Sequence, residues 1–273
     1  SEQALVQCYA ETITPRTKLI VLSHLCHRHG QILPVAQISR MARKHGVDVM
    51  VDAAHSFAQL DYQLPDLEAD FIATNLHKWF GAPLGTGLVF IRKTRLAEIR
   101  PLYGLPDSAN RPSMVPISGP IPVSIQRLAA PGTVAVPALL NIGDALAFQR
   151  AIDPAQKEQR LRYLTQYWLT RAQLIPHLQI ITPLDPAQSC AIAAFTLAGH
   201  SADDVVAALW QQARISAVSR QFNQLAMIKD ADHDAIDIAR QDARGVAHRL
   251  AAAELHLGPG QHHHLAAELA HPD

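Results

Sequence analysis

The sequence predicts an α/β protein: a mainly parallel sheet with crossover helices, followed by a smaller C-terminal α/β unit. Short runs of aliphatic and β-branched residues are typical of buried strands. An amphipathic helical pattern lies between the first two runs, and this alternation resumes on a smaller scale after Pro176. Because 48% of the residues are apolar and 18% are charged, the chain can bury a sizeable core.

The first strand–helix–strand unit has clear boundaries. Residues 17–25 read as a buried strand, and Pro34 opens a helix that Gly46 ends. Residues 47–51 read as the second strand. Two strands joined by a helix within so few residues indicate a parallel βαβ unit with a right-handed crossover.

The remaining pattern divides the chain into a partial large domain over residues 1–151, a partial small domain over 152–220 and a divergent, marginally ordered tail over 221–273. Further strands are expected at residues 70–74, 86–91, 177–182, 190–197 and 214–218, and helices at 137–151, 154–174 and 203–213. Six prolines between Pro101 and Pro122 predict a long loop.

The charge balance narrows the possible partners. Twenty-four basic residues match 24 acidic ones, which argues against nucleic acid or an anionic membrane as the main partner. Three cysteines without a disulfide pattern indicate a reducing compartment. No leader and no bilayer-spanning stretch is seen. We therefore expect a soluble, cytoplasmic protein, and the start at Ser1 without methionine suggests that an amino-terminal segment is missing.

Polar residues gather where the predicted parallel strands end, which is the edge where open α/β sheets bind ligands. Each of the first three strands delivers one group. The residues are Ser23, His24, His27 and His29; Asp52 and His55; and Thr74, Asn75, His77 and Lys78.

Lys78 is the most informative of these residues. The chain has six lysines against 18 arginines, and Lys78 lies between apolar and glycine-rich sequence. A partly desolvated lysine has a lowered pKa and becomes a nucleophile that forms Schiff bases; a lysine snorkelling from a loop is the alternative. The basic cluster of Arg92, Lys93 and Arg95, by contrast, is interpreted as a solvated helix start.

Asp52 ends an otherwise apolar strand. An unpaired buried carboxylate is costly, so Asp52 needs a cationic partner or several hydrogen-bond donors. A protonated pyridine nitrogen is such a partner in pyridoxal phosphate enzymes. The alternative is that Asp52 caps a helix beginning in the segment AAHSFAQ.

The segments VDAAHSFAQ and ADFIATNLHKWFGAPLGTGLVF resemble the core of the class V aminotransferase family of pyridoxal phosphate enzymes, which includes isopenicillin N epimerase-like proteins and cysteine desulfurases. The upstream SHLCHRHGQILPV and the downstream pair Gly132–Thr133 also resemble the family. The resemblance implies the large-domain fold of these transferases, without its amino-terminal segment.

The resemblance further implies that Lys78 holds pyridoxal 5'-phosphate as an internal aldimine and moves the α-proton of an amino-acid substrate. Asp52 would pair with the pyridinium nitrogen, and His55 would hydrogen-bond the phenolic oxygen or nearby groups. His77 and Asn75 match positions that reach the phosphate.

Two further positions belong to the same comparison. Thr133 matches a threonine that contacts the phosphate in the partner subunit, so a homodimer is implied. His27 stands where many relatives place an asparagine or threonine near the ring. The expected activity is that of an aminotransferase, epimerase or lyase in amino-acid metabolism. A desulfurase is disfavoured because the only late cysteine, Cys190, begins a predicted buried strand.

Two alternatives remain open at this point. The family carries a phosphate-holding loop ahead of the position of Ser1, so the chain is alternatively a non-catalytic remnant of the fold. A zinc-dependent hydrolase is a lesser alternative, because His24, Cys26, His27, His29, Asp52, His55 and His77 include every ligand type that zinc favours.

Overall fold

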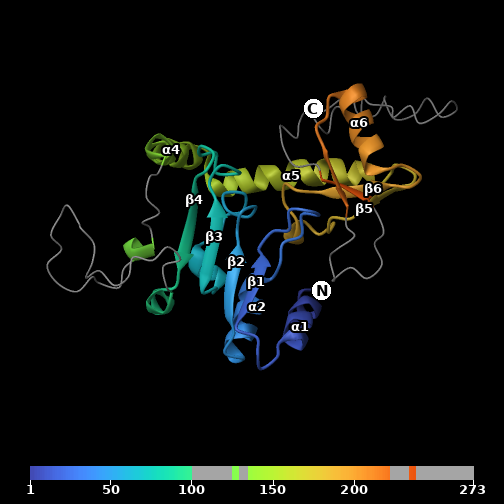
Figure 1. Ribbon diagram of the computed structural model, residues 1–273. Helices are drawn as coiled ribbons and strands as arrows, with labels where there is room; N and C mark the ends of the chain where they lie inside the picture. Colours follow the sequence, from blue (N-terminus) through green and yellow to red (C-terminus); the bar gives the residue numbers. More distant parts are fainter. Residues whose placement is uncertain (100–124, 129–134, 222–233, 238–273) are drawn as a thin grey trace. The chain divides into compact units, whose positions relative to one another are not determined.

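The computed structural model describes residues 1–99, 125–128, 135–221 and 234–237 (Figure 1). They form two compact units whose segments interleave along the chain. The first unit comprises residues 1–22, 34–54 and 63–148, and the second comprises residues 23–33, 55–62 and everything from 149 onward. The proline-rich stretch 101–122, Thr133 and most of the predicted tail lie outside the described residues, and the domain boundaries at 151 and 220 stay a prediction.

The first unit contains a four-stranded sheet with the strand order β1-β2-β3-β4. Its strands are β1 (Leu19–Ser23), β2 (Asp48–Asp52), β3 (Phe71–Asn75) and β4 (Gly87–Ile91). In Figure 1, β1, β2 and β3 run in the same direction; β2 and β3 pair in parallel, whereas β4 runs antiparallel to β3. The prediction of a mainly parallel α/β sheet is confirmed, and β4 is its antiparallel edge.

Helix α2 (Val35–Lys44) is the crossover between β1 and β2. It buries one face that includes Val35, Ile38 and Ala42, the positions at helical spacing in the sequence. Arg43 and Lys44 lie in its last turn, where cations interact favourably with the helix dipole. Val49 and Val51 of β2 are likewise buried, so the core of this unit is the layer between helix and sheet.

Other helical elements depart from the sequence prediction. Helix α1 (Glu2–Thr12) was not expected, and none of its residues is buried. The helix expected over 137–151 is two helices, α3 (Val136–Leu140) and α4 (Ile142–Ile152), with a break at Asn141, whose side-chain amide donates to the Pro137 carbonyl over 2.8 Å. Short 3-10 turns occupy Leu64–Leu67, Lys93–Glu98 and Ile125–Leu128.

The second unit is built on α5 (Pro154–Ala172), α6 (Ala202–Ala213) and a sheet ordered β5-β6-β8-β7. Its core packs Trp168 and Leu169 of α5 with Phe195 of β6 and Leu209 of α6. The strands are β5 (Leu178–Ile180), β6 (Ala194–Leu197), β7 (Val218–Gln221) and β8 (Asp234–Asp237), and a 3-10 turn spans Pro186–Gln188.

Two strand predictions for this unit were wrong in their bounds. The strand expected over 190–197 begins only at Ala194, and the one expected over 214–218 begins at Val218, because Arg214 adopts a left-handed conformation (φ 55°) that ends α6. Strand β8 comes from the stretch read as a tail. Among the described helices, none combines the length and apolar character that a bilayer crossing requires.

Candidate active site at the carboxyl edge of the first sheet

Parallel pairing of β2 and β3 brings Asp52 and the Lys78 loop to one edge of the sheet. Asp52, the last residue of β2, is in register with Ala73, two residues before β3 ends. The pairing continues past Asp52, since the Ala53 amide donates to the Ala73 carbonyl over 2.8 Å. The buried Thr74 hydroxyl donates to the Ala53 carbonyl over 3.3 Å. Both strand ends are therefore fixed side by side.

The Asp52 carboxylate differs from the prediction in its surroundings. Its side chain is exposed instead of buried, because β2 ends at the sheet edge. No helix follows: residues 54–56 form a turn, and one Asp52 oxygen accepts a hydrogen bond from the Ala54 amide over 2.8 Å. The helix-cap alternative was wrong, although Asp52 does cap this turn. The carboxylate is accessible to a ligand.

Lys78 lies on a short loop that the core holds at both ends. Leu76 and Phe80 flank it and are buried, at 0% and 7% exposure. The Leu76 amide donates to the Thr86 carbonyl over 3.0 Å, and its carbonyl accepts from the Ala82 amide over 2.9 Å. The Lys78 side chain is half-buried. Because the loop is anchored on β4 and in the core, the backbone that carries the amine is held in place.

His77 and Asn75 extend the site along the same edge. Asn75 ends β3 and is half-buried. The buried Nδ1 of His77 finds no hydrogen-bond partner among the described residues. An unsatisfied buried polar atom is costly, and such atoms in native proteins mark sites where a ligand or water binds. Carboxylate, amine and unpaired imidazole together fit the donor set that pyridoxal phosphate requires.

His27 and His55, also predicted site residues, belong to the second unit. His27 is exposed, and its ring stacks on that of His55, with ring centroids 5.6 Å apart and planes 21° apart. Burial lowers the pKa of His29 below its usual value, and the neighbouring His27 lowers it further. His24 is buried against Tyr62 with centroids 4.9 Å apart. Thr133 lies outside the described residues.

No observation favours a metal centre or a reactive late cysteine. Among the described residues, no three histidine, cysteine or acidic side chains lie close enough to hold a metal ion. Cys190 is 1% exposed, and burial raises the pKa of its thiol to about 12. A thiol in that state is not the thiolate that attacks sulfur.

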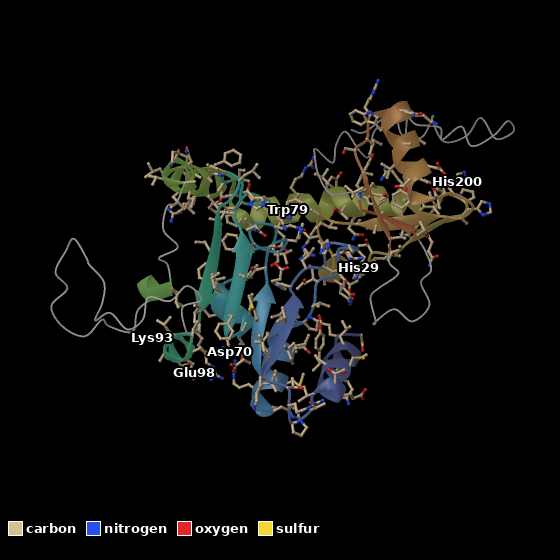
Figure 2. The ribbon with its side chains drawn as sticks, viewed as in Figure 1. His29, Asp70, Trp79, Lys93, Glu98 and His200 are labelled. Atoms are coloured by element: carbon tan, nitrogen blue, oxygen red, sulfur yellow. The ribbon has the colours of Figure 1, made fainter. Side chains whose placement is uncertain are left out.

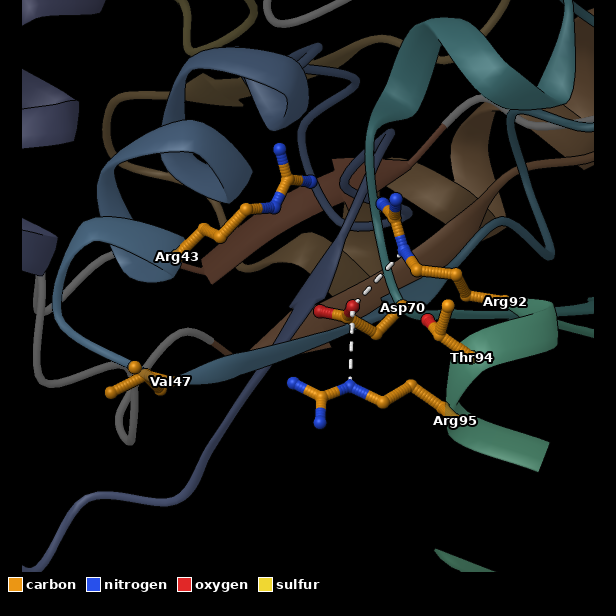
Figure 3. Close-up of a pocket in the computed structure, with 7 residues that line it drawn as sticks. Arg43, Val47, Asp70, Arg92, Thr94 and Arg95 are labelled. Atoms are coloured by element: carbon orange, nitrogen blue, oxygen red, sulfur yellow. Dashed lines mark ion pairs between the residues drawn. The ribbon is translucent and has the colours of Figure 1, made fainter. Parts of the chain in front are cut away.

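The opposite edge of the sheet carries a polar network that sequence reasoning missed. Figure 2 shows Trp79 and Asp70 at opposite ends of β3. Asp70 accepts a hydrogen bond from the Val49 amide over 3.0 Å and forms ion pairs with Arg92 at 3.1 Å and Arg95 at 3.7 Å (Figure 3). The cluster does start a helical turn, as predicted, since a 3-10 helix spans Lys93–Glu98, but Arg92 and Arg95 also pair with Asp70. An acidic residue directly before an apolar strand was the available signal.

A cavity of about 260 Å³ lies beside this network. Each of its three arginines pairs with a carboxylate among the described residues: Arg43 with Glu68, Arg92 with Asp70, and Arg95 with Asp48. The cavity therefore offers no unbalanced charge to an anionic ligand. We interpret the network as structural: it holds the beginnings of β2 and β3 together with the residues that follow β4.

Replacing Asp70 with alanine is expected to lower the free energy of unfolding by about 3 kcal/mol, since it leaves the buried Val49 amide without its acceptor and removes a carboxylate that Arg92 and Arg95 share. Replacing Glu98, an exposed partner of the same Arg95, with alanine is expected to cost less than about 1 kcal/mol. Urea unfolding of both variants measures the difference. Equal losses would show that Asp70 contributes no more than a surface pair.

Comparisons with known proteins show which family the chain resembles. Residues 2–219 match the model of the family described as aminotransferase class-V. Isopenicillin N epimerase of Streptomyces clavuligerus is 32% identical over 209 residues, which are 74% of this chain and 52% of that protein. A probable cysteine desulfurase of Halalkalibacterium halodurans is 26% identical over 73% of this chain and 47% of its own length. The chain thus spans about half the length of these relatives.

A solved structure of the cystine C-S lyase C-DES, in complex with its product cysteine persulfide, is 26% identical and superposes with a TM-score of 0.75, covering 91% of this chain and 64% of that one. A mutant of C-DES with glycine covalently linked to its pyridoxal phosphate cofactor superposes with a TM-score of 0.72 at 26% identity, covering 90% of this chain and 63% of that one.

Proposed function

The chain belongs to the aminotransferase class-V family of pyridoxal phosphate-dependent enzymes, and from that premise we propose that it acts at the α-carbon or amino group of an amino acid through a Schiff base on Lys78. The observation that carries the proposal is the placement of Asp52 and the Lys78 loop at the ends of two adjacent parallel strands. Under the proposal, the carboxylate pairs with the ring nitrogen of a substituted pyridine aldehyde and the amine with its aldehyde.

When bound, pyridoxal phosphate supplies an electron sink for charge that develops at the substrate α-carbon. Under this proposal, the exposed Asp52 carboxylate holds a proton on the pyridine nitrogen. Lys78 would hold the aldehyde end of the cofactor through its amine Nζ, with loss of water; once the substrate's amino group displaces it, the released amine would carry a proton to or from the α-carbon. Fixed backbone on both sides of Lys78 limits the positions that its amine reaches.

The neighbouring polar groups orient the cofactor. His77 and Asn75 follow β3 and are proposed to donate hydrogen bonds to the phosphate; the unpaired Nδ1 of His77 supports such a contact. His55 follows Asp52 by three residues and is proposed to donate to the phenolic oxygen, with His27 stacked on it. Thr133 is proposed to reach the phosphate of a partner subunit, which makes the active form a homodimer.

We propose epimerisation, transamination or elimination as the reaction type and not desulfuration. The identity to isopenicillin N epimerase supports the first of these. The burial of Cys190 argues against a cysteine nucleophile at that position, since its thiol stays protonated. These reactions share one step: a bond at the α-carbon breaks while the substrate's amino group is bound to the cofactor.

Titration with pyridoxal phosphate tests the proposal. The wild-type protein is expected to develop a visible absorbance band, whereas Lys78→Ala and Lys78→Arg are expected to develop none, because neither variant carries a primary amine at residue 78. Lys18→Ala, which removes an exposed lysine of the same unit, is the control and should match the wild type.

Amino acids added in heavy water then report the reaction class through deuterium incorporation at the α-carbon. Wild-type protein that folds but takes up no cofactor at Lys78 would favour the alternative of a non-catalytic remnant of this fold.

A further inference from the structure

Gln59 is a buried polar residue of the second unit that the proposed mechanism does not use. It is 1% exposed. Its side-chain nitrogen donates to the His55 carbonyl over 2.6 Å, and its side-chain oxygen accepts from the Ala191 amide over 2.9 Å. Its backbone carbonyl lies 3.8 Å from the Cys190 thiol, which donates to it. One side chain thus joins two segments more than 130 positions apart in the sequence.

At its carboxyl end, near Asp61, the loop that carries His55 also contacts α5, which joins it to the segment 186–191. The Asp61 amide donates to the Glu158 carboxylate. Glu158 also pairs with Arg162 on the next turn of α5 at 2.6 Å. The guanidinium of Arg162 donates in turn to the carbonyls of Pro186 and Ser189. Residues 55–62 are therefore fixed at both ends onto α5 and the segment 186–191.

The loop that carries His27 rests on the same segment. The Ile32 amide donates to the Gln188 carbonyl over 2.8 Å. Gly30 passes so close to Ile192 that a Cβ atom at residue 30 would lie 1.8 Å from the Ile192 carbonyl oxygen. Both histidine-bearing loops therefore take their position from residues 188–192, which we call the anchor segment.

We propose that Gln59 is a positioning residue: its amide joins the His55 loop to the anchor segment and so sets the stacked His27–His55 pair in place for the cofactor. The inference rests on the proposed function, since the pair has a task only if the protein binds pyridoxal phosphate. Gln59 itself touches neither cofactor nor substrate.

The chemistry of the two contacts requires a glutamine. One side-chain atom must donate to a carbonyl, and the other must accept from an amide, which a neutral amide does at once. A glutamate ionised at alkaline pH keeps the acceptor for Ala191 but cannot donate to His55, whereas a glutamate that burial keeps protonated would make both contacts, so Gln59→Glu is measured at alkaline pH. Leucine, of similar size, removes both contacts and leaves two buried backbone groups without partners.

The test uses Gln59→Leu and Gln59→Glu, with Gln179→Leu as control because Gln179 is exposed on β5 of the same unit. In cofactor-free protein, the ring signals of His27 and His55 are expected to carry mutual ring-current shifts that both Gln59 variants lose and the control keeps. Slow hydrogen exchange of the Ala191 amide is expected to survive in Gln59→Glu and vanish in Gln59→Leu. The dissociation constant for pyridoxal phosphate is expected to rise about tenfold in both.

The outcomes separate the inference from the proposed function. Unchanged His55 signals and unchanged cofactor affinity in folded Gln59→Glu would overturn the positioning role. Failure of Gln59→Glu to fold would also overturn it, because Gln59 would then serve folding as such. If the wild type binds no cofactor, the proposed function fails, while the ring-current and exchange results still decide whether Gln59 sets the histidine pair.

Discussion

Gly30→Ala is expected to lower the free energy of unfolding by about 4 kcal/mol or more. Gly30 has a φ of +77°, a left-handed conformation that costs an alanine about 1 kcal/mol. The added Cβ would also lie 1.8 Å from the oxygen and 2.8 Å from the carbon of the Ile192 carbonyl. Both atoms belong to the backbone, so no side-chain rotation relieves the overlap, and the anchor segment or the His27 loop must move.

Gly199→Ala isolates the contribution of the overlap. Gly199 has a φ of +81°, and a Cβ atom there meets nothing within 4 Å. Gly199→Ala is expected to lower the free energy of unfolding only by the cost of the left-handed conformation, about 1 kcal/mol. Urea unfolding of both variants gives the comparison, and similar losses for the two would show that Gly30 does not pack against Ile192 as described.

The second large effect is a loss of stability in acid through His24. The ring is 8% exposed, its Nδ1 has no partner among the described residues, and burial lowers its pKa from 6.5 to about 4. In the unfolded chain His24 takes up a proton near pH 6.5, so between pH 6.5 and 4 the unfolded state binds more protons than the folded one. Stability therefore falls as the pH falls, by about 3 kcal/mol in total.

His24→Leu removes this titration, and the difference in unfolding free energy between wild type and variant measured from pH 7 to pH 4 gives its size. Carboxylates titrate in the same range in both proteins, so they cancel in the difference. His200→Leu, at an exposed turn, serves as control and is expected to keep the wild-type pH dependence. The same pH dependence in His24→Leu as in the wild type would mean that His24 is protonated as readily folded as unfolded.

The sequence predicted those parts of the fold that depend on local pattern. The runs around Ile20, Val49 and Ile72 alternate or cluster apolar residues, and each became a strand of the first sheet. Because these strands are parallel, the ends of β2 and β3 lie at one edge, as the sequence predicted, and the joint role of Asp52 and Lys78 stays a prediction. The direction of β4 was not predictable, because the apolar pattern of a strand does not show whether it runs parallel or antiparallel to its neighbour.

The parts that escaped prediction depend on contacts between distant segments. Gln59 looks like any polar residue in a turn, and only its bond to Ala191 reveals its role. The need for Gly30 comes from Ile192, about 160 positions later. Asp52 was expected to be buried because strand residues around it are apolar, but the strand ends at the sheet edge and leaves it exposed. Such facts follow from tertiary packing and not from residue type.

The central claim is that the amine of Lys78 carries the cofactor. Incubation with pyridoxal phosphate, reduction with borohydride and peptide mapping by mass spectrometry test it directly, because reduction makes the bond permanent. The account predicts a phosphopyridoxyl group on the peptide that contains Lys78 and none on the peptide that contains the exposed Lys18. An unmodified Lys78, or labelling spread equally over both lysines, would contradict it.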